Sequence, residues 1–306
     1  MRGGAPKRPL PDTHTTFREA CSTRQLVHGR LVRNGQDPLH DCGINTSSGK
    51  RAVSRQVHRF ENGVRVFEDH LVPEQRQRYG IRNVHEIEEE DVFLRLIRSM
   101  PPEGCFVNIG SAIGYYPLLA KQRSPGLTIH AIEPLEIHRN FFRENIELNE
   151  LTQSDFTLHH FGASQSDGNA LLVEDRFMTA IEGGPASVYG QIRSTMRAML
   201  VAAGLRQPSR KASIATHSLG SILAMIGRPV DLCQMDIQGL EFAVLKGAVK
   251  TLRDRTIHTF LIGTHGRQLH RNCAAFLQDW GYRIEVDQPN PKNQPDGILV
   301  ANAAGT

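Results

Sequence analysis

Short apolar runs alternate with segments of helical hydrophobic spacing from residue 104 to the end of the chain. Such alternation is typical of a mostly parallel β-sheet with helices packed on both of its faces. The predicted strands span residues 105–110, 127–133, 156–162, 229–236 and 256–263, and two closing strands, 282–286 and 296–302, are expected to pair antiparallel. The predicted helices span residues 115–122, 135–149, 240–252 and 267–279. The pattern therefore predicts the α/β class with a doubly wound sheet.

The chain before residue 104 divides into two parts. Residues 1–55 are rich in Pro, Gly, Ser, Thr and Arg and show no sustained hydrophobic period, which predicts a disordered tail. Residues 56–103 are expected to pack on the core, because Asn62 and Gly63 fit a hairpin turn and residues 85–100 carry apolar side chains at helical spacing. The remaining residues, 104–302, are assigned to the α/β domain.

An insertion at residues 174–216 separates the third and fourth predicted strands. Connections of this length inside a domain usually have a function. The segment is expected to cover an acceptor site, and Tyr189, Met196 and Met199 suggest a partly apolar wall. A surface excursion without a role in binding is the alternative.

Charge and composition narrow the classes of protein further. Residues 1–58 hold ten Lys and Arg against four Asp and Glu, a balance of +6 that leaves −2 for the rest of a chain whose net charge is +4. Capture of nucleic acid by the folded domain is therefore not expected.

Five scattered cysteines without a CxxC spacing favour free thiols over disulfides or zinc. No apolar stretch reaches the roughly 18 residues of a membrane span and no signal peptide is recognisable, so a cytoplasmic location is expected.

Candidate chemistry begins where the first predicted strand meets its helix. In an open parallel sheet, ligands bind outside the carboxyl ends of the strands. The segment 108–116 reads NIGSAIGYY, with Gly110 and Gly114 at the two ends of a tight turn that would let the backbone approach a cofactor closely. Taken alone, such glycines are more often required by the turn itself.

The second predicted strand ends in Glu133, nineteen residues beyond Gly114. A carboxylate at this place can accept hydrogen bonds from both hydroxyls of an adenosine ribose. The same pair also fits an NAD-dependent oxidoreductase. That alternative requires a GxGxxG turn, however, and Ala112 and Ile113 do not provide one.

Four segments together resemble the FkbM family of methyltransferases. They are FVNIGSAIGYYPLLA at 106–120, IHAIEP at 129–134, NIELNEL at 145–151 and QMDIQGLEFAVLKGA at 234–248. They occur in the family's order, and the similarity covers about residues 85–300. The resemblance implies a Rossmann-like sheet of seven strands that binds S-adenosylmethionine and methylates an oxygen of a small-molecule or glycan acceptor.

The resemblance also implies roles for single residues. The turn from Gly110 to Gly114 would contact the amino acid part of the cofactor, Glu133 its ribose, and the segment 162–164 its adenine. Asp236, which closes the fourth strand, would face the sulfonium and the acceptor. The full set of expected cofactor-binding residues is Asn108, Gly110, Ser111, Gly114, Tyr115, Glu133, Gly162, Ala163 and Asp236.

His265 follows the fifth predicted strand and is the candidate base, with Asp236 as the second catalytic candidate. An unperturbed imidazole has a pKa near ~6.5 and accepts protons at neutral pH. Structural roles are the alternatives: a core histidine for His265 and a helix N-cap for Asp236.

Two departures from the family pattern bear on activity. Asn108 and Gln238 stand where the family has acidic residues, so a protein that binds S-adenosylmethionine without turnover is a further alternative. The segment 218–221 lacks the carboxylates that metal-using relatives gather before the fourth strand, and no metal is expected.

Overall fold

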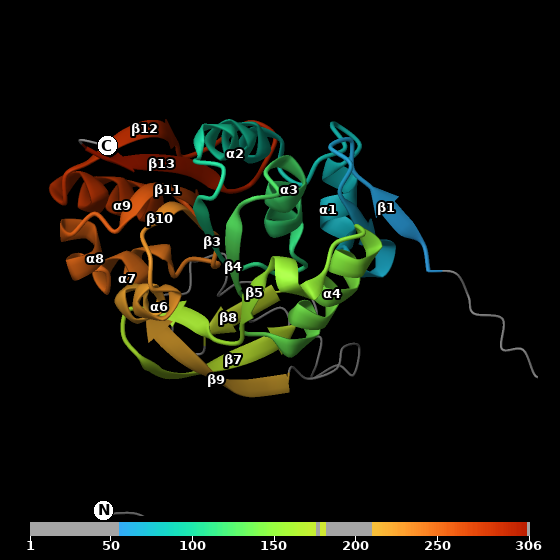
Figure 1. Cartoon of the computed structure of the whole chain (residues 1–306), viewed down its shortest axis with the longest axis horizontal. Helices are drawn as coiled ribbons and strands as arrows, with labels where there is room; N and C mark the ends of the chain where they lie inside the picture. The colour runs from blue at the N-terminus through green and yellow to red at the C-terminus, as the bar shows by residue number, and fades with distance from the viewer. Residues whose placement is uncertain (1–54, 176–177, 182–209, 305–306) are drawn as a thin grey trace, which may run out of the picture. The chain divides into compact units, whose positions relative to one another are not determined.

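A seven-stranded sheet with the order β12-β13-β11-β10-β3-β4-β5 forms the centre of the computed structural model (Figure 1). The structure describes residues 55–175, 178–181 and 210–304. The predicted tail lies outside the described residues except for residue 55, and so does the middle of the insertion with Tyr189, Met196 and Met199.

The strands of this sheet lie where the hydrophobic pattern predicts them. The parallel strands are β3 (Cys105–Ile109), β4 (Thr128–Ile132), β5 (Thr157–His159), β10 (Val230–Met235) and β11 (Ile257–Thr264). The last two, β12 (Tyr282–Gln288) and β13 (Gly297–Ala303), pair antiparallel with each other, and β13 also pairs antiparallel with β11. The predicted α/β class, the mostly parallel sheet and the closing antiparallel pair are confirmed.

Helices cover both faces of the sheet, because successive side chains of each buried strand point to opposite faces. Along β3, Phe106 packs with α2 (Ile87–Ser99), α3 (Tyr115–Arg123) and α4 (Glu136–Leu148). The neighbouring Cys105 and Val107 pack on the opposite face. The helices of that face are α6 (Leu219–Ile226), α7 (Glu241–Lys246), α8 (Val249–Arg253) and α9 (Arg267–Asp279).

One helix that was predicted as continuous is interrupted in the structure. The segment 240–252 forms two short helices, α7 and α8, with Gly247 between them. A Cβ at Gly247 would lie 2.1 Å from the carbonyl oxygen of Gln165, so the chain touches a neighbouring backbone there. Helical hydrophobic spacing continues through the break and therefore does not reveal it.

The segment before the sheet folds as a hairpin and helices. Strands β1 (Val57–Arg59) and β2 (Arg65–Phe67) pair antiparallel, with Asn62 and Gly63 in the turn as predicted. The 3-10 helix η1 (Glu68–His70) and helix α1 (Pro73–Arg78) follow and lead to α2. Asn149, at the end of α4, accepts from the backbone N–H of Arg65 and donates to its carbonyl oxygen, which fixes the hairpin to the core.

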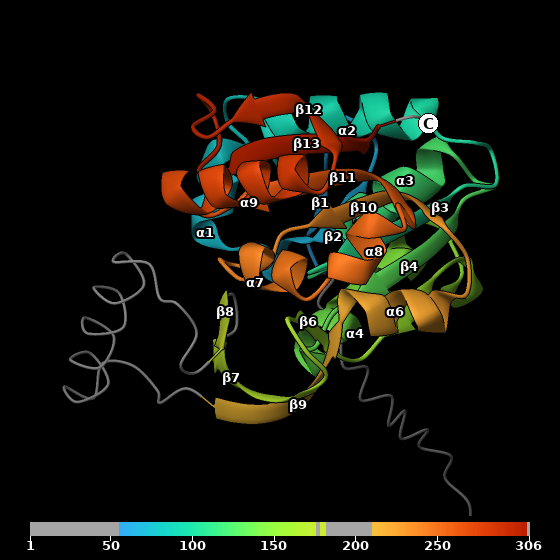
Figure 2. The same ribbon diagram turned by 90° about the vertical axis from the view of Figure 1, so that its left-hand side faces the viewer.

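The chain continues from β5 into a second, separate sheet, which was not predicted. Its order is β6-β9-β7-β8, and Figure 2 shows β7, β8 and β9 below the main sheet. The predicted strand 156–162 is divided between β5 and β6. The bounds are β6 (Gly162–Ser164), β7 (Gly168–Asp175), β8 (Met178–Ile181) and β9 (Arg210–Ser218), with a 3-10 helix η2 (Gln153–Asp155) before β5. Pairing of β7 with β9 brings the two ends of the insertion together.

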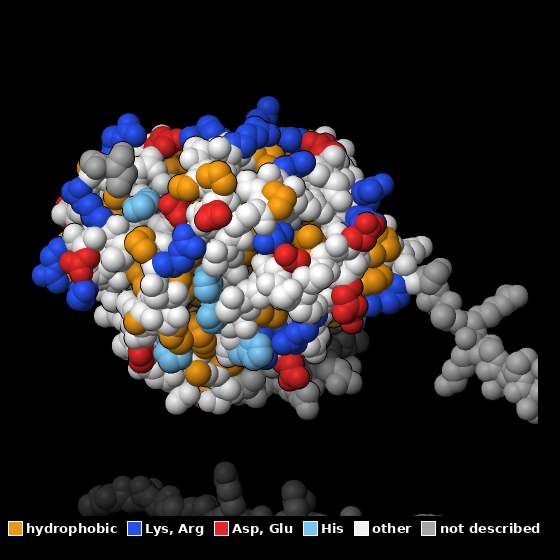
Figure 3. All heavy atoms as spheres, in the orientation of Figure 1, with side chains coloured by type: hydrophobic (Ala, Val, Ile, Leu, Met, Phe, Trp, Pro, Cys, Tyr) orange, Lys and Arg blue, Asp and Glu red, His pale blue; other side chains and the backbone are white. Residues whose placement is uncertain are grey.

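Histidine side chains gather on the face where β4 and β5 lie (Figure 3). The rings of His130 and His159 stack with centroids 5.3 Å apart, and Nδ1 of His130 lies 3.1 Å from Nε2 of His159. The ring centroid of Phe161 lies 5.2 Å from that of His159 and 4.6 Å from that of His217. Burial lowers the pKa of His130 to about 4, and lowers that of His159. Both rings are therefore neutral at physiological pH.

Cys105, Cys233 and Cys273 are buried free thiols, as expected. Among the described residues, the helices are all too short or too polar to cross a bilayer.

Candidate active site

A cavity of about 270 Å³ lies at the carboxyl ends of β3, β4 and β10. Strand β3 has β4 on one side and β10 on the other, so the chain leaves neighbouring strands in opposite directions. This switch point opens a crevice in a doubly wound sheet and is where such folds bind their ligands.

The turn after β3 forms one wall of the cavity. Gly110 and Gly114 have φ angles of +87° and +85°, which favour glycine. A Cβ at Gly110 would lie 2.1 Å from the carbonyl oxygen of Asp236, and a Cβ at Gly114 would lie 1.9 Å from the ring of Phe142. The fold itself therefore requires both glycines, whatever ligand the turn meets.

Glu133 lies directly beside this turn. Its Oε2 accepts from the backbone N–H of Ala112 and its Oε1 from that of Leu135, each over 2.9 Å. His138 Nδ1 lies 3.4 Å from Oε1. Each carboxylate oxygen carries a further lone pair, so the carboxylate can still accept hydrogen bonds from a ligand in the cavity.

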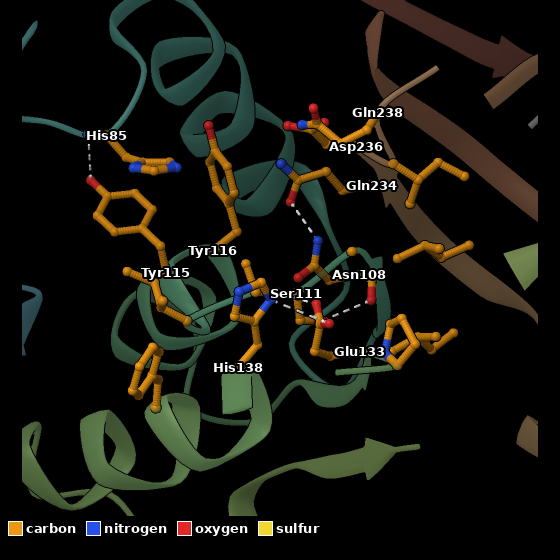
Figure 4. A pocket seen from close by; sticks show the side chains of 18 of the residues that line it. His85, Asn108, Ser111, Tyr115, Tyr116, Glu133, His138, Gln234, Asp236 and Gln238 are labelled. Atoms are coloured by element: carbon orange, nitrogen blue, oxygen red, sulfur yellow. Dashed lines mark hydrogen bonds and ion pairs between the residues drawn. The ribbon is translucent and has the colours of Figure 1, made fainter. Parts of the chain in front are cut away.

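A buried chain of side chains extends from β3 to α2. Asn108 donates to Oε1 of Gln234 over 3.3 Å, and Gln234 donates to Oε1 of Glu89 over 2.7 Å (Figure 4 shows the first of these bonds). Burial raises the pKa of Glu89 to about 7. Asn108 thus acts as a donor, a role that the acidic residue of the family pattern could not fill when ionised.

His265 lies among three carboxylates. Its Nδ1 is 3.0 Å from Glu241, and its Nε2 is 3.3 Å from Asp296 and 3.5 Å from Asp236. Burial alone would lower the pKa of His265, but the hydrogen bond to Glu241 and the charges of Asp236, Glu241 and Asp296 outweigh it and raise the pKa to about 10. The ring is therefore cationic at neutral pH, and its unperturbed pKa does not describe it.

Burial also raises the pKa of Asp236, to about 8. Oδ1 of Asp236 makes no hydrogen bond with any described residue, although it lies 3.5 Å from Nε2 of His265. Asp236 lines the cavity beside the Gly110 turn, where its carboxylate can interact with a bound molecule.

The hydroxyl of Tyr115 is hydrogen-bonded within the protein, although Tyr115 directly follows the glycine turn. Its hydroxyl donates to Glu90 and accepts from the side chain of Asn62 and the backbone N–H of His85. These contacts tie α3 to the hairpin and to the start of α2. Tyr115 lines the cavity, but its hydroxyl is already occupied by these partners.

Most of the residues expected from the sequence meet in this one place. The cavity lining includes Asn108, Gly110, Ser111, Tyr115, Glu133, Gly162, Ala163 and Asp236. Two of the expected residues are not part of the lining. Gly114 is the N-cap of α3, and His265 contacts Asp236 and Asp296, which do line the cavity.

Sequence reasoning missed Glu86 and Asp296. Both line the cavity, and their carboxylate oxygens and that of Asp236 all lie within 4.8 Å of one another. The expectation from residues 218–221 concerned that segment alone, whereas these carboxylates come from before α2 and before β13. No local motif marks either position. Only the fold brings them together.

Comparison with known proteins gives the family. The family model described as "Methyltransferase FkbM domain" matches residues 105–284, which is more than half of the chain. The chain belongs to the FkbM methyltransferase family. The predicted resemblance is thereby confirmed.

Individual relatives are distant. A curated protein of Jannaschia sp. (strain CCS1), whose name proposes it as a methyltransferase, is 26% identical over 206 residues, which cover 64% of this chain and 68% of the relative. "Methyltransferase 1" of Beauveria bassiana (strain ARSEF 2860) is 22% identical over 200 residues, which cover 63% and 78%. The crystal structure of methyltransferase FkbM from Methylobacillus flagellatus KT shares 17% identity with a TM-score of 0.44, over 65% of this chain and 44% of that chain. The FkbM-family chain thus spans less than half of that structure.

Proposed function

We propose that this FkbM-family chain transfers the methyl group of S-adenosylmethionine to a hydroxyl of a small-molecule or glycan acceptor. The observation that supports the proposal best is the contact between Glu133 and the backbone of the Gly110 to Gly114 turn, at the switch point of the sheet. That contact holds a carboxylate with free lone pairs beside a turn that lines the cavity, as an adenosine ribose requires.

The residues present fit the cofactor along the length of the cavity. Glu133 would accept the ribose hydroxyls, and Gly162 and Ala163 would lie against the adenine. The turn after β3 would face the amino acid part. Asp236, with a buried oxygen that makes no hydrogen bond with the described residues, would attract the positive charge of the sulfonium.

The acceptor end of the cavity would be formed by Asp236, Asp296 and His265. Bound S-adenosylmethionine supplies a methyl carbon activated by positive sulfur, so the protein chiefly aligns the acceptor oxygen with it. Asp236 would accept a hydrogen bond from the acceptor hydroxyl. Asp236 would assist removal of the proton, because His265, the base expected from the sequence, already carries a proton at neutral pH.

Calorimetric titration tests the cofactor. S-adenosylmethionine and S-adenosylhomocysteine should bind, and NAD should not. Binding of NAD without S-adenosylmethionine would overturn the proposal in favour of an oxidoreductase.

Methyl transfer to a panel of hydroxyl acceptors tests turnover. Wild-type protein should methylate at least one acceptor class, and Asp236→Ala and His265→Ala should each lose most of that activity while still binding S-adenosylhomocysteine. Full activity in Asp236→Ala would remove this residue from the reaction. A protein that binds the cofactor and methylates nothing would favour the non-catalytic alternative.

A further inference from the structure

Three carboxylates meet at the acceptor end of the cavity from distant parts of the chain. Glu86 precedes α2, Asp236 follows β10 and Asp296 precedes β13, and their oxygens lie within 4.8 Å of one another. All three line the same cavity. Oxygens this close together can contact the same bound ligand, beside Arg78 and His265, which already lie next to them.

The charges around this cluster do not balance. Glu89 adds a fourth carboxylate. Glu86 and Glu89 are buried, and Asp236 and Asp296 are partly buried. The four face two cationic side chains, because Arg78 lies 3.4 Å from Glu86 and His265 lies 3.3 Å from Asp296. His265 also pairs with Glu241. Buried carboxylates are normally compensated by cations. The described residues therefore supply too little positive charge for the cluster when it is ionised.

Tyr116 provides independent evidence for a missing partner. Its side chain lines the same cavity and is only 8% exposed, and its hydroxyl makes no hydrogen bond with any described residue. Figure 4 shows the phenol extending from α3 on the side of the cavity where Asp236 lies. Burial, together with the charges of Glu89 and Glu86, raises the pKa of Tyr116. A buried hydroxyl of this kind normally has a partner such as an ordered water.

A second group, Asp236, Glu241 and His265, has similar spacing. Its Glu241 accepts from the backbone N–H groups of Ile237 and Gly239 and pairs with His265, so it holds the loop after β10 in place. The oxygens of Glu86 and Asp296 make no such backbone contacts among the bonds of the described residues. The first group is the better candidate for a ligand.

We propose that Glu86, Asp236 and Asp296 bind a hard divalent cation of the Mg²⁺ or Mn²⁺ class. Carboxylate oxygens are the ligands such ions prefer, and three of them leave octahedral positions for water and for an acceptor hydroxyl. A water on the ion would give the Tyr116 hydroxyl a hydrogen-bond partner.

The consequence for the reaction rests on the proposed function. The ion would bind the acceptor oxygen and lower the pKa of its hydroxyl. The proton leaves to water, an oxygen lone pair forms the new O–C bond, and the S–C bond breaks with its electron pair remaining on sulfur. The ion itself is unchanged, and it takes over part of the deprotonation assigned to Asp236.

The test is a titration of the full chain, freed of metal by a chelator, with MnCl2 alone. Electron paramagnetic resonance of free Mn²⁺ should show one bound ion per chain. Asp296→Asn and Glu86→Gln should each weaken binding by at least the roughly tenfold that loss of an outer partner of a metal ligand costs. Asp279→Asn, which removes an exposed carboxylate at the end of α9, should bind as wild type does.

Thermal unfolding separates loss of the site from loss of the fold. Mn²⁺ should raise the Tm of wild type and of Asp279→Asn but not that of Asp296→Asn, compared with KCl at equal ionic strength. Without metal, Asp296→Asn should unfold at or above the Tm of wild type, because it relieves repulsion among the carboxylates. Equal Mn²⁺ binding in Asp296→Asn and Asp279→Asn, or no binding to wild type at millimolar Mn²⁺, would overturn the proposal.

Titration of the metal-free protein with S-adenosylhomocysteine keeps the two proposals distinct. Binding of this ligand without any binding of Mn²⁺ would remove the cation site and leave the methyltransferase proposal standing. Weaker binding of the cofactor product in Asp296→Asn, with no Mn²⁺ bound to wild type, would assign the cluster to the cofactor's ammonium group and overturn the cation site.

Discussion

Ala112 donates its backbone N–H to Glu133 Oε2 over 2.9 Å, and this bond joins the turn after β3 to the end of β4. Ala112 has a φ of +44°, an unusual value for a residue with a side chain. The turn and the carboxylate therefore form one unit. A change in the position of one of them therefore changes the position of the other, and with it the contacts of a bound ligand.

Glu133→Gln should disturb both the turn and the binding of the cofactor. The amide has one oxygen, so it can accept from Ala112 or from Leu135, and its NH2 group then faces the remaining N–H. We expect a loss of about 1 to 3 kcal/mol in the free energy of unfolding. Calorimetry should also show weaker binding of S-adenosylhomocysteine.

The control for this change is Glu136→Gln, an exposed position in the first turn of α4. It should leave both measurements close to wild type. If Glu133→Gln behaves as Glu136→Gln does, Glu133 neither stabilises the turn nor binds the cofactor.

Gly110→Ala should destabilise the protein more than Gly63→Ala. Both glycines have positive φ, +87° and +97°, so each substitution costs the roughly 1 to 2 kcal/mol of a left-handed residue with a Cβ. Only at Gly110 does the new Cβ also meet a backbone atom, at 2.1 Å from the oxygen of Asp236, whereas nothing lies within 4 Å at Gly63. Chemical denaturation of both variants measures the difference, and equal losses would contradict the close approach.

Asn108→Asp should be destabilising although it restores an acidic residue of the family pattern. It removes the donor to Gln234 and places a second carboxylate near Glu89. A buried acceptor left without its donor costs about 1 to 3 kcal/mol. Denaturation of the single variants and of Asn108→Asp combined with Glu89→Gln should show coupling, because the double variant has only one carboxylate. Simple additivity would argue against the buried chain.

Stability should fall between neutral and acidic pH because of the histidines on β4 and β5. Burial, with the neighbouring charges of His159 and Arg228, lowers the pKa of His130 to about 4. The unfolded chain takes up this proton near pH ~6.5, whereas the folded protein resists it until about 4, so falling pH favours unfolding across that window. Denaturation curves at several pH values should show this slope, and His130→Gln should reduce it. Equal slopes in the two proteins would exclude His130 as a source.

Periodicity determined the sheet because it depends on local burial. Side chains of β3, β10 and β11 are buried on both faces, so these strands appear as continuous apolar runs. The order of the predicted strands along the chain therefore matched the structure. The division of 156–162 between two sheets and the break at Gly247 depend on neighbouring backbone, which leaves no periodic signal.

The meeting of these cavity residues was predictable because they lie close to strand ends. Gly110, Glu133 and Asp236 each follow a strand of the parallel sheet, and the carboxyl ends of such strands share one edge. The fold thus places them together once the strands are known.

The sequence by itself determined the strand-end chemistry, the α/β class and the family resemblance, because these follow from short-range patterns of residues. Only the tertiary structure decided that Glu86 and Asp296 join Asp236, and that His265 is held as a cation. Charges act across space rather than along the chain. Two carboxylates more than two hundred residues apart can therefore set the chemistry of one site without any mark in the sequence around them.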